Sequence, residues 1–306
     1  MARSRLSVIV ACHNMRRELP RTLYTLSPAY QRGIAPDEYD VVVVDNGSTP
    51  PVSSADVSAF GPNFHLTRSP LPTPSPASGI NAAARAAAGD VIVVCIDGAR
   101  MLTPGILRLT AAAFRAFDDP VVATLSWHLG PKLQNQSLLE GYDQRVEDAL
   151  LDSVDWRRDG YELFRISTLA ASSGDGWFLP AAESNCLALS RSAFAGLGGL
   201  DERFRSAGGG LVALDFYRRA CESRGELVLL LGEGTFHQFH GGVATNAPPD
   251  RHPFSDFHRE YVALRGKPFA APRATAIYLG TVPPQAMPFL KASAEAALAI
   301  APADGS

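Results

Sequence analysis

The sequence predicts an α/β protein built on a doubly wound, mostly parallel sheet. Three apolar runs support this prediction, at residues 6–11, 39–44 and 91–96, and each shows little polar alternation. Such runs are typical of strands that are buried on both faces, as in the middle of a parallel sheet. Segments with helical spacing separate the runs, and a β-α-β-α-β order favours parallel pairing.

Helical segments are expected in the intervals between these strands. Leu19, Leu23 and Leu26 recur at helical spacing after the first strand. An alanine-rich helix over residues 81–88 precedes the third strand, and Gly89 would end it. Three further helices are expected: one that begins at Thr103, one that begins at the capping-box pattern Ser137–Glu140, and one over residues 211–223. Further strands are expected at residues 121–125, 185–189 and 227–231.

The chain divides into three parts by composition. Residues 1–126 hold the alternating strands and helices, and residues 127–245 form a smaller, loop-rich α+β part of the same domain. Residues 246–306 are a Pro- and Ala-rich C-terminal extension. Within the first part, residues 49–76 are rich in Pro and Ser and predict a stiff extended loop.

Composition limits the partners and the location of the chain. It has 306 residues, 46% of them hydrophobic, and a formal net charge of −3, so no global basic field attracts nucleic acid. Four widely spaced cysteines predict buried free thiols rather than a disulfide or zinc framework. No signal-peptide pattern precedes the first strand, and no apolar run approaches a transmembrane span. We therefore expect a cytoplasmic protein, with a peripheral position at the inner membrane face left open.

Polar side chains follow three of the predicted strands where each strand ends. Cys12-His13-Asn14 follows the first, Asp45-Asn46-Gly47-Ser48 the second and Asp97-Gly98 the central one. Ligands of open α/β sheets bind beyond the carboxyl ends of the strands, which predicts a binding site here. No G-x-G-x-x-G follows the first strand, which disfavours a nicotinamide Rossmann enzyme.

A fourth segment, Gly198-Gly199-Leu200-Asp201-Glu202-Arg203-Phe204, joins these three in order along the chain. Together they resemble the family 2 glycosyltransferases of GT-A fold, over roughly residues 5–240. The resemblance implies a nucleotide-diphospho-sugar donor, UDP-linked by default, and inverting transfer to a glycan, a lipid-linked sugar or a small molecule. It leaves the oligomeric state open, a homodimer included.

The resemblance also implies which residues bind the donor. In the family, the aspartate that matches Asp45 contacts the nucleotide base, and the turn that matches residues 11–14 lies beside it. The alternative for Asp45 is a turn aspartate that is satisfied within its own turn. The predicted nucleotide-sugar site comprises Ala11, His13, Asn14, Asp45, Asn81, Arg85, Asp97 and Arg100.

The metal motif of the family, Asp-x-Asp, is altered in this chain, where it reads Asp97-Gly98-Ala99. Paired carboxylates hold Mn²⁺ or Mg²⁺, which neutralises the diphosphate leaving group. Two arrangements stay open. In the first, the metal is held by Asp97, by the diphosphate of the donor and by a distant histidine, His240 in preference to His237. In the second, Arg100 supplies the positive charge and the enzyme is metal-independent.

The catalytic base of inverting family members is altered as well. Where the family carries its carboxylate, this chain has the apolar run 211–214. The candidate catalytic residues are Glu183 and Asp215, with Asp175 a further carboxylate, and the alternative for Asp215 is an ion pair with a neighbouring arginine. These departures keep a second function open, a catalytically degenerate protein of the same fold that binds a nucleotide sugar or glycan.

Overall fold

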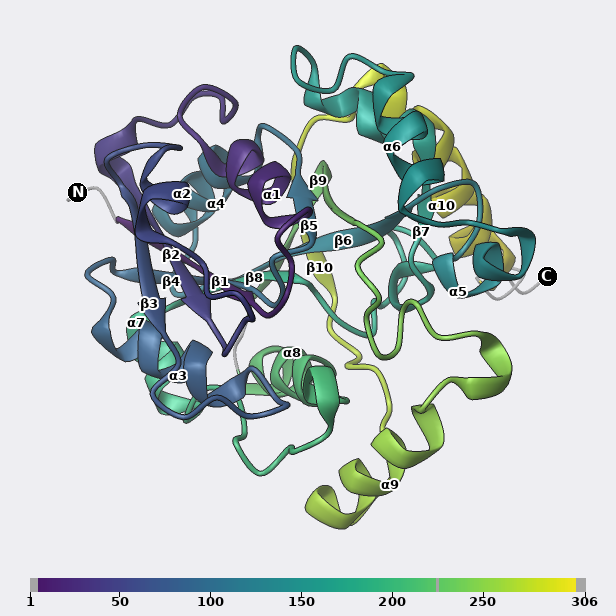
Figure 1. The fold of residues 1–306 in the computed structure, drawn as a ribbon. Helices are drawn as coiled ribbons and strands as arrows, with labels where there is room; N and C mark the ends of the chain where they lie inside the picture. The colour runs from purple at the N-terminus through teal and green to yellow at the C-terminus, as the bar shows by residue number, and fades with distance from the viewer. Residues whose placement is uncertain (1–4, 224–225, 301–306) are drawn as a thin grey trace.

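The computed structural model describes residues 5–223 and 226–300 of the chain. Its main feature is a curled sheet with the strand order β10-β9-β6-β8-β4-β1-β2-β3, to which β5 and β7 add short pairings (Figure 1). The strands are β1 (Leu6–Cys12), β2 (Tyr39–Asp45), β3 (Phe64–Arg68), β4 (Val91–Cys95), β5 (Arg100–Leu102), β6 (Val121–Leu129), β7 (Ser167–Leu169), β8 (Cys186–Ser190), β9 (Leu227–His237) and β10 (Ala276–Gly280). This architecture confirms the predicted fold class.

Most neighbouring strands run parallel. β1 is parallel to β2 and β4, β2 to β3, and β9 to β6 and β10. β8 lies antiparallel between β4 and β6, while β5 and β7 pair antiparallel with β9 and β6. Because β1, β2 and β4 are parallel, their carboxyl ends meet at one edge of the sheet. Cys12 lies opposite Asp45 in the register, so the polar turns after β1 and β2 are adjacent.

Helices cover both faces of the sheet. The apolar side chains of α1, α2 and α4 pack on one face, and those of α3, α7, α8 and α9 on the other (Figure 1). Neighbouring residues of β1 alternate between the two apolar clusters, which is why this strand is apolar on both sides. The helices are α1 (Leu19–Leu26), α2 (Ser54–Ser58), α3 (Ala77–Ala86), α4 (Ile106–Ala116), α5 (Gln134–Ser137), α6 (Gln144–Asp152), α7 (Arg191–Gly196), α8 (Val212–Ser223), α9 (Phe254–Arg265) and α10 (Met287–Ile300).

Two local predictions were wrong. Residues 49–76 are not one extended loop, because they contain α2 and β3. The pattern Ser137–Glu140 does not begin a helix. It forms the end of α5 and a 3₁₀ turn, and α6 begins instead at Gln144. The N-cap of α6 is Asp143, whose side chain accepts hydrogen bonds from the backbone of Arg145 and Val146. In the first place, strand pairing of β3 with β2 overrides the loop-like composition of the segment. In the second, Asp143 caps the helix in place of Ser137.

The C-terminal residues form part of the sheet. β10 runs parallel to β9, and Phe289 of α10 packs on Trp127 with ring centroids 5.6 Å apart. The described part of the predicted extension is therefore folded against the rest, while residues 301–306 lie outside the described residues. The four cysteines are free and buried, as predicted. Among residues 5–223 and 226–300, every helix is too short or too polar to cross a membrane.

Candidate active site

The loops after β1 and β2 are joined by hydrogen bonds between their polar residues. The His13 Nδ1 atom lies 3.0 Å from the carbonyl oxygen of Asn46. The backbone N–H of Asn14 donates to the Ser48 hydroxyl at 3.0 Å, and the N–H of Thr49 donates to the Asn14 side chain at 2.8 Å. Asn14 has a left-handed backbone with φ of 54°, a conformation that asparagine tolerates better than most residues. The two loops therefore form one rigid polar surface at the carboxyl edge of the sheet.

Asp45 lies beneath this surface and is 2% exposed. One carboxylate oxygen accepts the backbone N–H of Ser48 at 2.9 Å, and the other accepts that of Val52 at 3.1 Å. Asp45 thus accepts hydrogen bonds within its own turn, which is the alternative that the sequence analysis gave for this residue. Each oxygen retains a second lone pair, so a contact with a base stays a prediction. Ala11 is buried in β1 opposite Val44, directly before this edge.

Asp97 follows β4 at the same edge and is bonded to the residues after it. One oxygen accepts the backbone N–H of Ala99 at 3.0 Å, and the other accepts Nε–H of Arg100 at 3.0 Å. The Asp97 side chain is 20% exposed, whereas that of Arg100 is 8% exposed. The ion pair therefore has an accessible acidic end and a buried basic end.

Three histidines surround the guanidinium of Arg100. Pairing of β5 with β9 places Arg100 opposite His237, and pairing of β6 with β9 places His128 opposite the same histidine. The rings of His128 and His237 have centroids 5.7 Å apart, and the Nε2 atoms of His237 and His240 are 3.2 Å apart. Residues from three separate segments of the chain thus meet around Arg100.

These histidines are neutral near pH 7. Burial, with a further contribution from the charge of Arg100, lowers the pKa of His128 to about 3 and that of His237 well below its usual value. Burial also lowers the pKa of His240, although Asp97 and Glu18 oppose it. The His237 Nδ1 atom lies 2.8 Å from the side-chain oxygen of Gln134, which only accepts. His237 therefore donates from Nδ1 and accepts at Nε2 from His240.

A buried carboxylate, Glu147 of α6, holds this histidine segment in place. It accepts the backbone N–H of Phe239 at 2.6 Å and both terminal nitrogens of Arg17 at 3.3 Å. Burial raises the pKa of Glu147 to about 7, and these hydrogen bonds oppose the rise. Glu147 thus joins the β1–α1 loop to the end of β9. The sequence offered no signal for this residue, because a glutamate in a polar helix ordinarily faces solvent.

The residues near Asp97 do not fit a divalent metal site. Ala99 is fully buried within the apolar cluster on the α1 and α4 face, so no carboxylate stands at the second motif position. One Asp97 oxygen is bonded to the cationic Arg100, which competes with a metal for that ligand. Within the described ranges, no three His, Cys, Asp or Glu side chains are grouped so that they could hold a metal ion. The predicted protein ligands, Asp97 and His240, are therefore not joined by a third protein ligand among these described residues.

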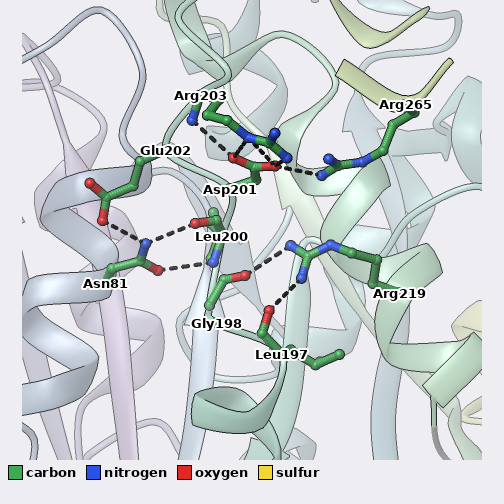
Figure 2. Close-up of a pocket in the computed structure, with 10 residues that line it drawn as sticks. Asn81, Leu197, Gly198, Leu200, Asp201, Glu202, Arg203, Arg219 and Arg265 are labelled. Carbon is green, nitrogen blue, oxygen red and sulfur yellow. Dashed lines mark hydrogen bonds and ion pairs between the residues drawn. The ribbon is translucent and has the colours of Figure 1, made fainter.

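A cavity of about 530 Å³ lies elsewhere, between α3, the loop after α7, α8 and α9 (Figure 2). Asn81 of α3 faces it and is fully engaged. Its amide nitrogen donates to the Leu200 carbonyl and the Glu202 carboxylate, and its oxygen accepts the N–H of Leu200. Asn81 therefore fixes the Gly-Gly-Leu-Asp-Glu segment, and its contact with the donor stays a prediction.

Arg85 is also separated from the donor loops. It is exposed on the last turn of α3, six residues before β4 begins. A helix that connects parallel strands runs back across the sheet, so its last turn lies near the amino ends of the strands. This position favours a place for Arg85 away from Asp45 and Asp97, and the predicted donor contact stays a prediction.

Asp215 does not have the environment of a catalytic base. It is 1% exposed, and its oxygens are bonded to Arg219 at 2.8 Å and to Arg265 of α9 at 2.6 Å. The arginine alternative given by the sequence is thus observed, and Arg265 adds a second partner from 50 residues away. Two guanidinium groups occupy the lone pairs that a base would offer to a hydroxyl, so Asp215 joins α8 to α9 instead.

Glu183 lies at the edge of the sheet where Asp97 lies. β8 is antiparallel to β4, with Cys186 opposite Cys95, so the residues before β8 meet those after β4. Glu183 is half-buried and accepts one hydrogen bond, from the side chain of Asn185 at 3.3 Å. The structure thus brings Glu183, one of the two predicted catalytic carboxylates, to this edge.

Comparison with known proteins agrees with this arrangement. Residues 7–140 match the model of the family "Glycosyl transferase family 2". Comparison with curated protein sequences gave no match.

Similar solved structures have the same fold at low sequence identity. S. aureus TarS 1-349 in complex with UDP is 15% identical, with a TM-score of 0.53 over 85% of this chain and 64% of that one. The same protein in complex with UDP-GlcNAc is 16% identical, with a TM-score of 0.53 over 84% and 66%. GalNAc-T7 with UDP, GalNAc and Mn²⁺ is 14% identical, with a TM-score of 0.52 over 85% and 47%. This chain thus spans about half to two thirds of the length of these structures.

The matched residues 7–140 contain the loops after β1 and β2, the Asp97–Arg100 pair and His128. Residues 7–140 of this chain therefore match the glycosyl transferase family 2 model, and the chain has the GT-A fold of these solved structures.

Proposed function

We propose that this protein is a glycosyltransferase that takes a sugar from a nucleotide-diphospho donor, UDP-linked by default. The observation that carries the proposal is the meeting of Asp45, the His13–Asn14 turn and Asp97 at the carboxyl edge of β1, β2 and β4. This edge lies wholly within the family 2 domain. The solved structures with UDP and UDP-GlcNAc support a uridine nucleotide as the first donor to test.

In this proposal the donor lies along the edge from β2 to β4. The base lies nearest Asp45, whose remaining lone pairs accept from a ring N–H, and the turn of His13 and Asn14 lines one side. The sugar end lies beyond Asp97, toward the start of β8. The acceptor is a glycan, a lipid-linked sugar or a small molecule.

The proposed reaction inverts the anomeric carbon. An acceptor hydroxyl attacks this carbon, the nucleoside diphosphate leaves from the opposite side, and a carboxylate takes the proton of the hydroxyl. Glu183 is our candidate for this base, because it lies at the Asp97 edge and, among the described residues, only one of its oxygens is bonded. We prefer it to Asp215, whose oxygens are bonded to two arginines.

A radiolabelled panel of nucleotide sugars tests the function. We expect release of labelled sugar from one donor, faster with acceptor glycans, and loss of this activity in Asp45→Ala. Asp250→Ala, at an exposed position, is the control and keeps full activity. If UDP binds while no donor is turned over with any acceptor or divalent metal, the degenerate binding protein becomes the correct function. That alternative is favoured by one observation, the apolar run 211–214 at the usual place of the base.

A further inference from the structure

The guanidinium of Arg100 is incompletely paired although it is buried. Its side chain is 8% exposed, and its Nε–H donates to Asp97. Its Nη1 atom is buried and has no hydrogen-bond partner among the residues that the structure describes. A buried charged donor without a partner is costly, typically about 1–3 kcal/mol or more, so its retention needs an explanation. The open donors point to a ligand that carries hydrogen-bond acceptors.

The groups that face Arg100 make the site suited to an anion. Its charge acts on His128, His237, His240 and Cys95, and these groups are uncharged near pH 7 because burial disfavours their charged forms. Asp97 is the acid bonded to it, and Asp97 is the more exposed member of the pair. Arg100 is thus the cationic group at the centre of this cluster, and it stands at the edge where the proposed donor carries its phosphates.

The position of Arg100 also explains the altered metal motif. The second motif position is filled by the buried methyl group of Ala99, and Arg100 follows it in β5. Guanidinium groups bind phosphate oxygens in a bidentate manner and carry a fixed positive charge. The neighbouring ion pair orients the guanidinium through Nε, which leaves the terminal nitrogens free to donate.

We infer that Arg100 binds the diphosphate of the nucleotide donor in the place of a divalent metal, so that donor binding in this protein is metal-independent. The inference rests on the proposed function. On donor binding, the terminal nitrogens of Arg100 donate to phosphate oxygens and stabilise the charge of the leaving diphosphate. Asp97 acts as a positioning residue for the guanidinium and is not itself a metal ligand.

Calorimetric binding of UDP and of uridine, each in EDTA and in Mn²⁺, tests the inference. GDP with guanosine and ADP with adenosine complete the panel, because the base is not fixed by the structure. We expect UDP to bind in EDTA and to bind more tightly than uridine, and Mn²⁺ to change its affinity less than threefold. In Arg100→Gln, UDP should bind about ten- to hundredfold more weakly, as expected for the loss of charge-assisted hydrogen bonds, while uridine binds unchanged.

Two further variants separate an arginine clamp from a metal held by Asp97. Asp97→Asn keeps Arg100 and removes the carboxylate, so UDP should bind in EDTA within about threefold of the parent protein. A metal ligand at this position predicts the opposite, a large loss that appears only with Mn²⁺. Arg145→Gln, at a side chain that is 93% exposed, is the matched control for removing one arginine and leaves UDP binding unchanged.

The double variant Asp97→Asn/Arg100→Gln guards against misfolding, because it leaves no unpaired charge at the site. It should bind uridine normally and UDP as weakly as Arg100→Gln does. UDP binding that requires Mn²⁺ and is indifferent to Arg100→Gln would overturn the inference and leave the glycosyltransferase proposal standing. If no nucleoside diphosphate binds with or without metal, the proposed function fails, and the inference fails with it.

Discussion

Two aspartate–arginine clusters of this protein differ in how completely the charges are paired. Asp215 is 1% exposed and binds Arg219 and Arg265 with both oxygens, and Arg219 also donates to the backbone carbonyls of Leu197 and Gly199. The Asp97–Arg100 pair has one ion-pair contact, a half-buried acid and an arginine nitrogen without a partner among residues 5–223 and 226–300. The fully paired cluster joins two helices, and the open one is the proposed binding site of the diphosphate.

How completely an aspartate is paired with arginines therefore distinguishes a structural carboxylate from a functional one, whereas residue type is the same in both clusters. Both aspartates lie in segments that resemble functional motifs of the family, yet only Asp97 retains unpaired neighbours. Removal of one member of a fully paired buried cluster should therefore lower stability. Removal of Arg100 from the open cluster should weaken binding of the nucleoside diphosphate instead.

The largest expected effect is on catalysis and separates Glu183 from Asp215. Glu183→Gln removes the proposed base but keeps the hydrogen bond from Asn185, so kcat should fall about a thousandfold, within the range of general-base catalysis. KM for the donor should change less than threefold. Initial rates measured with the matched variant Glu202→Gln as a control check the assignment. A Glu183→Gln enzyme that keeps more than a tenth of its kcat would mean that another group takes the proton.

The next largest effect is on stability at the paired cluster. Asp215→Ala leaves the charges of Arg219 and Arg265 uncompensated in a mostly buried place. Because these arginine side chains retain some solvent contact, we expect a loss of roughly 2–4 kcal/mol in the free energy of unfolding. Urea denaturation measures it, and UDP binding by the folded protein should stay unchanged. A loss below about 0.5 kcal/mol, the range of ordinary surface substitutions, would show that the cluster is not structural.

Glu147 allows a test by pH. Its pKa is raised from 4.5 to about 7 in the folded state, so the folded protein binds more protons than the unfolded one between these values. The contribution of Glu147 to stability is therefore fully present below about pH 4.5 and is lost as pH rises to about 7, by roughly 2–3 kcal/mol. Unfolding measured between pH 5 and pH 8 should show this slope in the parent protein. Glu147→Gln should flatten it, and a slope that persists in the variant would assign it to other groups.

The smallest expected effect is on stability at the open pair. Asp97→Asn keeps the side-chain shape and its hydrogen-bonding oxygen at a position in contact with solvent. We expect a loss of about 1 kcal/mol or less in the free energy of unfolding, well below that of Asp215→Ala. Thermal and urea unfolding of the two variants side by side measure the difference. Equal losses would contradict the distinction between the two clusters.

Local sequence determined the centre of this protein. β1, β2 and β4 were predicted within one residue of their bounds, because strands buried on both faces need long apolar runs whatever surrounds them. The polar residues at their carboxyl ends were predicted for the same reason, since the chain must turn there. The edge strands β3 and β10 were missed, because they are half-exposed and their short runs carry little apolar signal.

Only the tertiary structure decided which of the predicted side chains meet. Arg100 reaches His237 through the pairing of β5 with β9, and Asp215 is occupied by Arg265 from 50 residues away. Asn81 and Arg85 lie on one helix, whose apolar residues face the sheet. Asn81 is bonded to the loop at Leu200, which is distant in sequence, whereas Arg85 faces solvent. Residue type and order along the chain predict which chemistry is available. Long-range strand pairing and ion pairing decide where it is used, because they depend on segments that no local pattern connects.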